Sequence, residues 1–184
     1  MRWTKLPENM AEFDAMAEKY GDGAEEFKAL AGVKTEEDLQ ALFRTDSFTG
    51  MVAGAYLFGT LQARQGRTTY LYEFDPDIPG EDNPGSFHGA ELWFAYDSLG
   101  RSWRPFSGKH YDLSRKVSSY WVNFVKKGDP NGSDHFGEPL PEWKPFDEAE
   151  QFMLLIGNEP AKRDAKIDPL MQLRIDRTLE DMEK

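Results

Sequence analysis

The sequence predicts an α/β fold that is rich in helices and has few strands. Two apolar runs, TTYLYEF at 68–74 and QFMLLI at 151–156, are the strand candidates. Their β-branched, aromatic and aliphatic residues alternate little with polar ones, which is typical of strands covered on both faces. Helical patterns surround both runs, and this order favours layered α/β packing. Two strands alone make a marginal sheet, so we expect the sheet to continue in sequence outside this chain.

Composition limits the possible functions. A chain of 184 residues is expected to form one domain, 1–184, with a sizeable core. The net charge of −11 disfavours nucleic acid as a partner. The absence of cysteine excludes disulfides, a thiol nucleophile and cysteine-based zinc sites. Neither an apolar run of spanning length nor a leader is present, so we expect no membrane contact and a cytoplasmic, bacterial protein.

Residues 1–66 are predicted to be mostly helical, because apolar residues recur there at helical spacing between capping signals. The first predicted helix covers 10–20, and the second runs through Leu30 and opens with a capping box of Asp22 and Glu25. The third is EEDLQALF, capped by Thr35, and the fourth is longer, from about Ser47 to Gln65.

The rest of the chain divides into 67–160, with both strands and further helices, and 161–184, a C-terminal helix. The clearest helix is Asp112–Lys127, which Gly128 ends. Its apolar stripe consists of Leu113, Val117, Tyr120, Trp121 and Phe124. Asp168 as the cap and Pro169 at the first helical position open the C-terminal helix.

His88 is the candidate catalytic residue, in the loop NPGSFHGAEL at 83–92. An imidazole titrates near neutral pH and suits general-base work. Its place after a buried strand matches the edge where open α/β sheets build their sites. A base needs a nucleophile, however, and the chain has no G-x-S-x-G and no HGGG-type oxyanion loop. Ser86 is near in sequence, but nothing holds it on a strained turn, so a solvated or structural His88 remains an alternative.

No metal site or cofactor is predicted. The three histidines lack the close spacing of zinc ligands. Two turns, 75–80 and 129–133, begin like calcium loops, but Ser86 and Leu140 stand where such a loop needs glutamate. We interpret both as acidic turns.

Several separated blocks, in order, resemble the C-terminal part of a type-B carboxylesterase. They are TYLYEFDPDIPG, GSFHGAELWFAY, LSRKVSSYWVNFVKKGDPNG, LPEWKPF and MLLIGNEP. The resemblance runs from about Lys19 to Pro160 and is best between Tyr70 and Ile156. The family includes the para-nitrobenzyl esterases and cholinesterases, and the resemblance implies an α/β-hydrolase fold.

The resemblance also implies site residues. In the family, the histidine of FHGAEL completes a Ser–Glu/Asp–His triad, which gives His88 the role of general base. Glu91, one helical turn on, would either support the loop or face solvent. Phe87, Trp93 and Phe94 would line the substrate pocket. Trp93 stands where many members have proline, and FAYDSL replaces the more usual FVFGTL, so the departures lie near that pocket.

The implied function is hydrolysis of carboxylic esters by a longer protein. The order in this fold is serine, acid, histidine, so the serine elbow, the oxyanion loop and the acid are expected upstream, in a missing N-terminal part. The chain is then a C-terminal fragment, inactive alone. The alternative is a non-enzymatic remnant that forms a homodimer or binds a partner through exposed apolar surface and strand edges.

Overall fold

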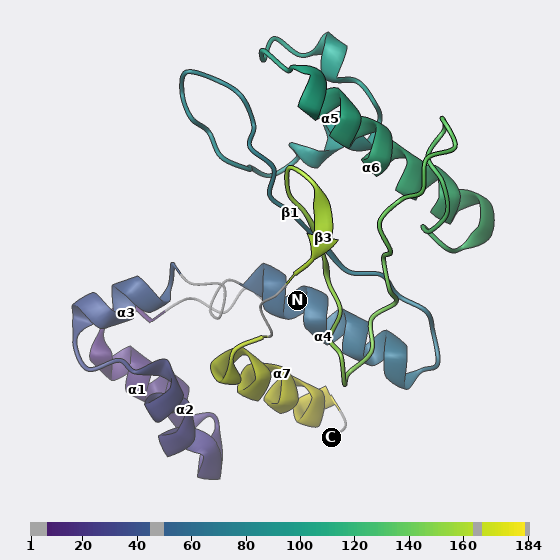
Figure 1. Ribbon diagram of the computed structural model, residues 1–184. Helices are drawn as coiled ribbons and strands as arrows, with labels where there is room; N and C mark the ends of the chain where they lie inside the picture. Colours follow the sequence, from purple (N-terminus) through teal and green to yellow (C-terminus); the bar gives the residue numbers. More distant parts are fainter. Residues whose placement is uncertain (1–6, 45–49, 164–166, 183–184) are drawn as a thin grey trace. The chain divides into compact units, whose positions relative to one another are not determined.

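A computed structural model describes residues 7–44, 50–163 and 167–182 (Figure 1). The chain divides into two compact units. Unit 1 comprises 1–65 and 165–184, and unit 2 comprises 66–164. Each unit has its own buried core. One domain over 1–184 stays a prediction.

Unit 1 consists of helices in its described part. They are α1 (Met10–Glu18), the short 3-10 helix η1 (Gly21–Gly23), α2 (Ala24–Ala31), α3 (Glu36–Leu42), α4 (Gly50–Arg64) and α7 (Pro169–Met182). The core gathers apolar side chains from several of them: Phe13, Ala17, Phe27, Leu39 and Leu170. Burial of these side chains, spaced at helical intervals, stabilises helices that are too short to persist alone.

The predicted caps of unit 1 have different outcomes. At α3 the capping box forms, because Thr35 Oγ1 accepts from Asp38 N at 3.1 Å and Asp38 Oδ2 accepts from Thr35 N at 2.9 Å. At α7 the Asp168 carboxylate accepts from Met171 N, as predicted. The predicted capping box of Asp22 and Glu25 does not form. The chain makes a 3-10 turn there, and Gly23 precedes α2 without a side-chain cap.

Unit 2 contains a sheet of three short strands, β1 (Tyr72–Phe74), β2 (Leu154–Ile156) and β3 (Pro160–Lys162), in the order β1-β2-β3. β1 and β2 are parallel, with Tyr72 opposite Leu154, and β3 is antiparallel to β2. Both predicted strands form only at the ends of their runs, 68–74 and 151–156. Near the beginning of the first run the backbone bonds elsewhere, since Thr69 O accepts from Phe146 N at 2.8 Å.

The helices of unit 2 are α5 (Glu91–Ala95), the 3-10 helix η2 (Leu99–Arg101) and α6 (Gly108–Lys127). α6 begins at Gly108 rather than at the predicted Asp112, because Ser107 and His110 form its capping box. It ends at Gly128 in the left-handed conformation, as predicted. No helix in the described ranges has both the length and the apolar character needed to cross a bilayer.

The core of unit 2 lies among α5, α6 and the sheet (Figure 1). Its buried side chains include Phe94, Leu113, Val117, Tyr120, Trp143, Leu154 and Ile156. The predicted stripe of α6 therefore supplies three of the core residues, and Trp121 packs against them partly buried. This core fixes the end of β1 relative to α5, the two elements that flank His88.

Candidate functional site

His88 lies on a tight turn between the loop that follows β1 and the start of α5. Ala90 N donates to Phe87 O at 3.0 Å, which closes the turn. Gly89, the third residue of the turn, has a φ of +86°. This is the conformation that a type II turn requires at that position and that glycine adopts without strain. The sequence F-H-G-A therefore folds locally so that His88 stands at the tip.

The imidazole of His88 is exposed, and no hydrogen bond or ion pair joins it to another described residue. Its turn follows the carboxyl end of a strand that pairs in parallel, the edge where open α/β sheets place their ligands. Ser86 is not its partner in the described structure. The Ser86 hydroxyl donates to Pro76 O at 3.0 Å and so ties down the start of the same loop.

Glu91 is half-buried in the first turn of α5. Its charge acts on Tyr72 of β1. Burial, and in second place the charge of Glu91, raises the pKa of Tyr72. The support of the His88 loop by Glu91 stays a prediction.

The three predicted pocket residues lie at different depths. Phe87 is exposed, Trp93 is half-buried, and the two rings meet edge to face with centroids 5.8 Å apart. Phe94 is 0% exposed and packs against Phe74 with centroids 5.2 Å apart. In this structure Phe94 is a core residue, and Phe87 and Trp93 form the aromatic surface next to His88. That the three line a substrate pocket stays a prediction.

Sequence reasoning missed the side chains of α6 that hold the loop before His88. The Lys109 ammonium lies 2.9 Å from Asp77 Oδ2, and Nε2 of the buried His110 lies 3.1 Å from Asp77 O. His110 Nδ1 accepts from Ser107 N at 2.9 Å, so we assign the ring proton to Nε2, which donates to Asp77 O. The hydrogen bond and charge of Lys109 lower the pKa of Asp77. These partners are far apart in sequence, so no local pattern could have indicated them.

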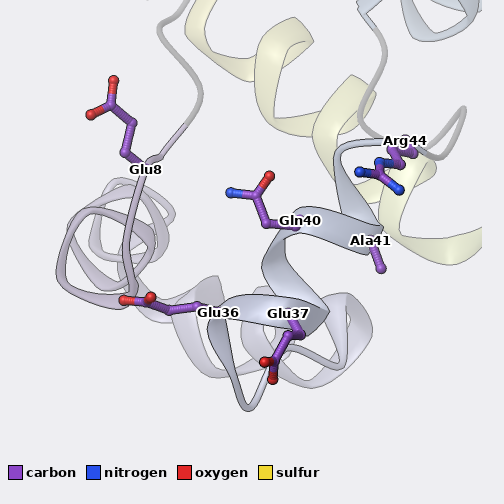
Figure 2. Close-up of a pocket in the computed structure, with 6 residues that line it drawn as sticks. All are labelled: Glu8, Glu36, Glu37, Gln40, Ala41 and Arg44. Atoms are coloured by element: carbon purple, nitrogen blue, oxygen red, sulfur yellow. The ribbon is translucent and has the colours of Figure 1, made fainter.

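A hollow of about 380 Å³ lies in unit 1 rather than beside His88. Its lining consists of Glu8, Glu36, Glu37, Gln40, Ala41 and Arg44. Figure 2 shows that the three glutamate side chains point in different directions and do not converge on one position. Across the described ranges, no group of three or more histidine, aspartate or glutamate side chains is arranged to hold a metal ion. The hollow therefore does not have the geometry of a metal-binding site.

Sequence comparisons connect the chain with ester hydrolases. The model of a family described as the carboxylesterase family matches residues 8–173. Cocaine esterase of Homo sapiens is 42% identical over 69 residues, which are 37% of this chain and 11% of that protein. Carboxylesterase 1C of Rattus norvegicus is 30% identical over 149 residues, 76% of this chain and 24% of that protein. The chain thus spans a quarter or less of the length of these curated relatives.

Solved structures agree on the fold. A PNB esterase superposes with a TM-score of 0.59 at 20% identity, covering 95% of this chain and 34% of that one. An esterase from Clostridium hathewayi, described as able to hydrolyse aliphatic aromatic polyesters, gives a TM-score of 0.54 at 20% identity, covering 97% of this chain and 34% of that one. These neighbours are α/β-hydrolases, which confirms the predicted fold class.

Proposed function

This chain belongs to the carboxylesterase family, and from that premise we propose that it is the C-terminal region of a serine ester hydrolase and supplies the triad histidine, His88. The serine, the acid and the oxyanion donors then come from polypeptide that precedes these residues. The absence of G-x-S-x-G from the chain supports this reading. By itself the chain is inactive toward esters.

The observation that carries the proposal is the presentation of His88. Its imidazole is exposed at the tip of a turn closed by the hydrogen bond from Ala90 N to Phe87 O at 3.0 Å. A general base needs one ring nitrogen free for the serine hydroxyl and the other for the acid that orients the ring. A histidine whose two ring nitrogens are both already hydrogen-bonded, as those of His110 are to Ser107 N and Asp77 O, could not do this.

The chemistry of His88 is proton transfer. Its free nitrogen takes the proton of the serine hydroxyl as the serine oxygen attacks the ester carbonyl, and the imidazolium then protonates the leaving alcohol. In deacylation the ring activates water in the same way. The second nitrogen donates to the acid, which stabilises the imidazolium and fixes the tautomer.

The test begins with the reading frame upstream of Met1 in the gene. We expect it to encode a serine elbow and an acid, and we expect the longer product to hydrolyse a short-chain p-nitrophenyl ester. His88→Gln should lower kcat by a factor of about 10⁴ or more. The matched control is His135→Gln, which changes another exposed histidine and should leave the rate unchanged. The 184-residue chain, with or without His88→Gln, should show only the background rate.

Two results would contradict the proposal. One is a stop codon directly before Met1 with no gene for the complementary part nearby. The other is hydrolysis by the 184-residue chain that disappears in His88→Gln, since a nucleophile would then lie within these residues.

A second candidate function, self-association of a non-enzymatic remnant, is favoured by apolar side chains at the end of α6. Val122, Phe124 and Val125 are all exposed there. Under this alternative a second copy covers them, and light scattering gives a dimer that Val125→Lys dissociates. A monomer at high protein concentration would exclude it.

A further inference from the structure

Arg104 contacts both limbs of the loop that leads to His88. On the incoming limb, its Nη1 donates to Pro79 O at 2.9 Å and to Asp82 Oδ1 at 3.0 Å. Its Nη2 donates to Asp82 Oδ2 at 3.1 Å, so the guanidinium and the carboxylate form a two-point ion pair. The Arg104 side chain is 6% exposed and that of Asp82 is 54% exposed, so the pair is shielded from water and salt on the Arg104 side.

The outgoing limb contacts the same guanidinium through an aromatic ring. The guanidinium carbon of Arg104 lies 5.4 Å from the ring centroid of Phe87 and 4.5 Å from that of Trp103. Phe87 directly precedes His88, and its carbonyl accepts the hydrogen bond that closes the His88 turn. Any movement of Phe87 therefore moves the turn at whose tip the imidazole stands.

The loop closes so tightly on this ion pair that position 80 has no room for a side chain. A Cβ on Gly80 would lie 2.2 Å from Asp82 Oδ1 and 2.5 Å from Arg104 Nη1. Both neighbours are the ends of side chains that bond to each other, so one or both must shift to admit a Cβ, and the shift disturbs the bond between Asp82 Oδ1 and Arg104 Nη1. Gly80→Ala should therefore separate Arg104 from Asp82 without removing a charge.

From these contacts we infer that Arg104 is a positioning residue for His88, an inference that rests on the proposed function of His88. The guanidinium joins the two limbs of the loop, residues 79–88, and fixes the turn that presents the imidazole. Lysine cannot replace it, because an ammonium can neither donate two parallel hydrogen bonds to the Asp82 carboxylate nor present a planar group to the Phe87 ring. The base of the loop has separate anchors in His110, Lys109 and Ser86. Loss of Arg104 should therefore loosen the loop locally.

The first experiment measures order in the loop of the whole 184-residue chain and needs no activity. Amide hydrogen exchange is compared among the unchanged chain, Arg104→Lys and Gly80→Ala. In both variants we expect exchange across 80–90 to accelerate about tenfold or more, as expected for loss of a charged hydrogen-bond pair. Amides of β2 and α6 should keep their rates. The matched control is Arg101→Lys, which changes an exposed arginine of η2 and should alter neither region.

Unchanged exchange in the loop would overturn the inference, and so would equal acceleration throughout unit 2, because Arg104 would then serve only general stability. Gly80→Ala keeps the test decisive if Arg104→Lys folds poorly.

The second experiment uses the longer product encoded by the full reading frame. Arg104→Lys should lower kcat about tenfold to a hundredfold by misplacing the base, while KM changes less than about twofold. If His88→Gln abolishes hydrolysis and Arg104→Lys leaves kcat unchanged, the positioning role is wrong and the proposed function stands. If His88→Gln has no effect, the proposed function is wrong, and the exchange result still decides whether Arg104 orders the loop.

Discussion

Asn131 and Trp143 exchange two hydrogen bonds across unit 2. Trp143 N donates to Asn131 Oδ1 at 2.7 Å, and Asn131 Nδ2 donates to Trp143 O at 2.9 Å. The indole Nε1 of Trp143 in turn donates to Leu71 O at 3.0 Å, directly before β1. The segments GDPNG and LPEWKPF, which contributed to the family resemblance, are thus joined by hydrogen bonds. The second segment is also bonded to the residue before β1, the strand that leads to the His88 loop.

Asn131→Asp should destabilise unit 2 by about 2 kcal/mol, because the new carboxylate cannot donate to Trp143 O and faces the carboxylate of Asp129. The measurement is urea unfolding followed by tryptophan fluorescence. Asn83→Asp introduces the same charge on the exposed surface of the loop and is the control, with an expected change within about 0.5 kcal/mol. Equal effects of the two changes would mean that added charge, rather than the lost donor, is responsible.

Phe94→Ala should lower the unfolding free energy of unit 2 much more than Phe87→Ala, because Phe94 is a core residue and Phe87 lies at the surface. Phe94 is 0% exposed, so its truncation should cost about 3–5 kcal/mol of unfolding free energy. Phe87 is exposed, and its truncation should change that free energy by less than about 1 kcal/mol. Thermal and urea unfolding check both values. A small effect of Phe94→Ala would show that the interior of unit 2 packs more loosely than the structure indicates.

Asp134 should give unit 2 a stability that is lost in acid. Burial opposes its ionisation, but the backbone N–H groups of Glu138 and Phe136, together with Arg115, outweigh this and hold the pKa of Asp134 below its ordinary value. A carboxyl whose folded pKa is lowered stabilises the fold above the unfolded pKa, near 3.9, and that contribution disappears as the pH falls through the folded value.

The stability difference between the unchanged chain and Asp134→Asn should therefore be largest near pH 7 and should narrow below about pH 4. Urea titrations at a series of pH values measure it. Asp112→Asn removes the more exposed aspartate that also faces Arg115 and is the control, with a small difference at every pH. If the difference in unfolding free energy between the unchanged chain and Asp134→Asn stayed constant down to about pH 2, the lowered pKa of Asp134 would be contradicted.

Thr35→Ala should lower the stability of unit 1 by about 1 kcal/mol, since the N–H of Asp38 would lose its acceptor. Far-UV circular dichroism during urea unfolding detects the loss of helix. Thr178→Ala removes a hydroxyl that only bonds back to Arg174 O within α7, and it should be neutral or slightly stabilising. If both changes had the same effect, the capping box would contribute nothing specific.

Helices with apolar stripes and clear caps could be predicted from the sequence, as α3, α6 and α7 illustrate. The beginning of α6 could not, because His110 takes the place in its capping box that glutamate or glutamine usually holds. β3 also escaped prediction, because Pro160–Lys162 has no strand signal and becomes extended only by pairing with β2. Strand lengths were overestimated, because tertiary contacts rather than propensity end β1 and β2.

For the candidate site, the resemblance points to His88, whose catalytic role stays a prediction, and its turn could be anticipated from the glycine that follows it. The contacts that hold the loop could not. Arg104 reaches Pro79 across 25 positions and Asp82 across 22. Tertiary packing brings such partners together, and patterns in a single sequence do not predict contacts between residues so far apart.

The tryptophans of unit 2 make it optically heterogeneous. Trp103 is 78% exposed and stacks on Arg104, whereas Trp143 is 5% exposed among aromatic rings. A water-soluble quencher such as iodide should therefore reach the Trp103 indole and spare that of Trp143. The emission of unit 2 then combines a quenchable signal from Trp103, beside Arg104, with a shielded signal from Trp143 and those of the half-buried Trp93 and Trp121. The part that iodide quenches therefore reports on the neighbourhood of the loop without an attached dye.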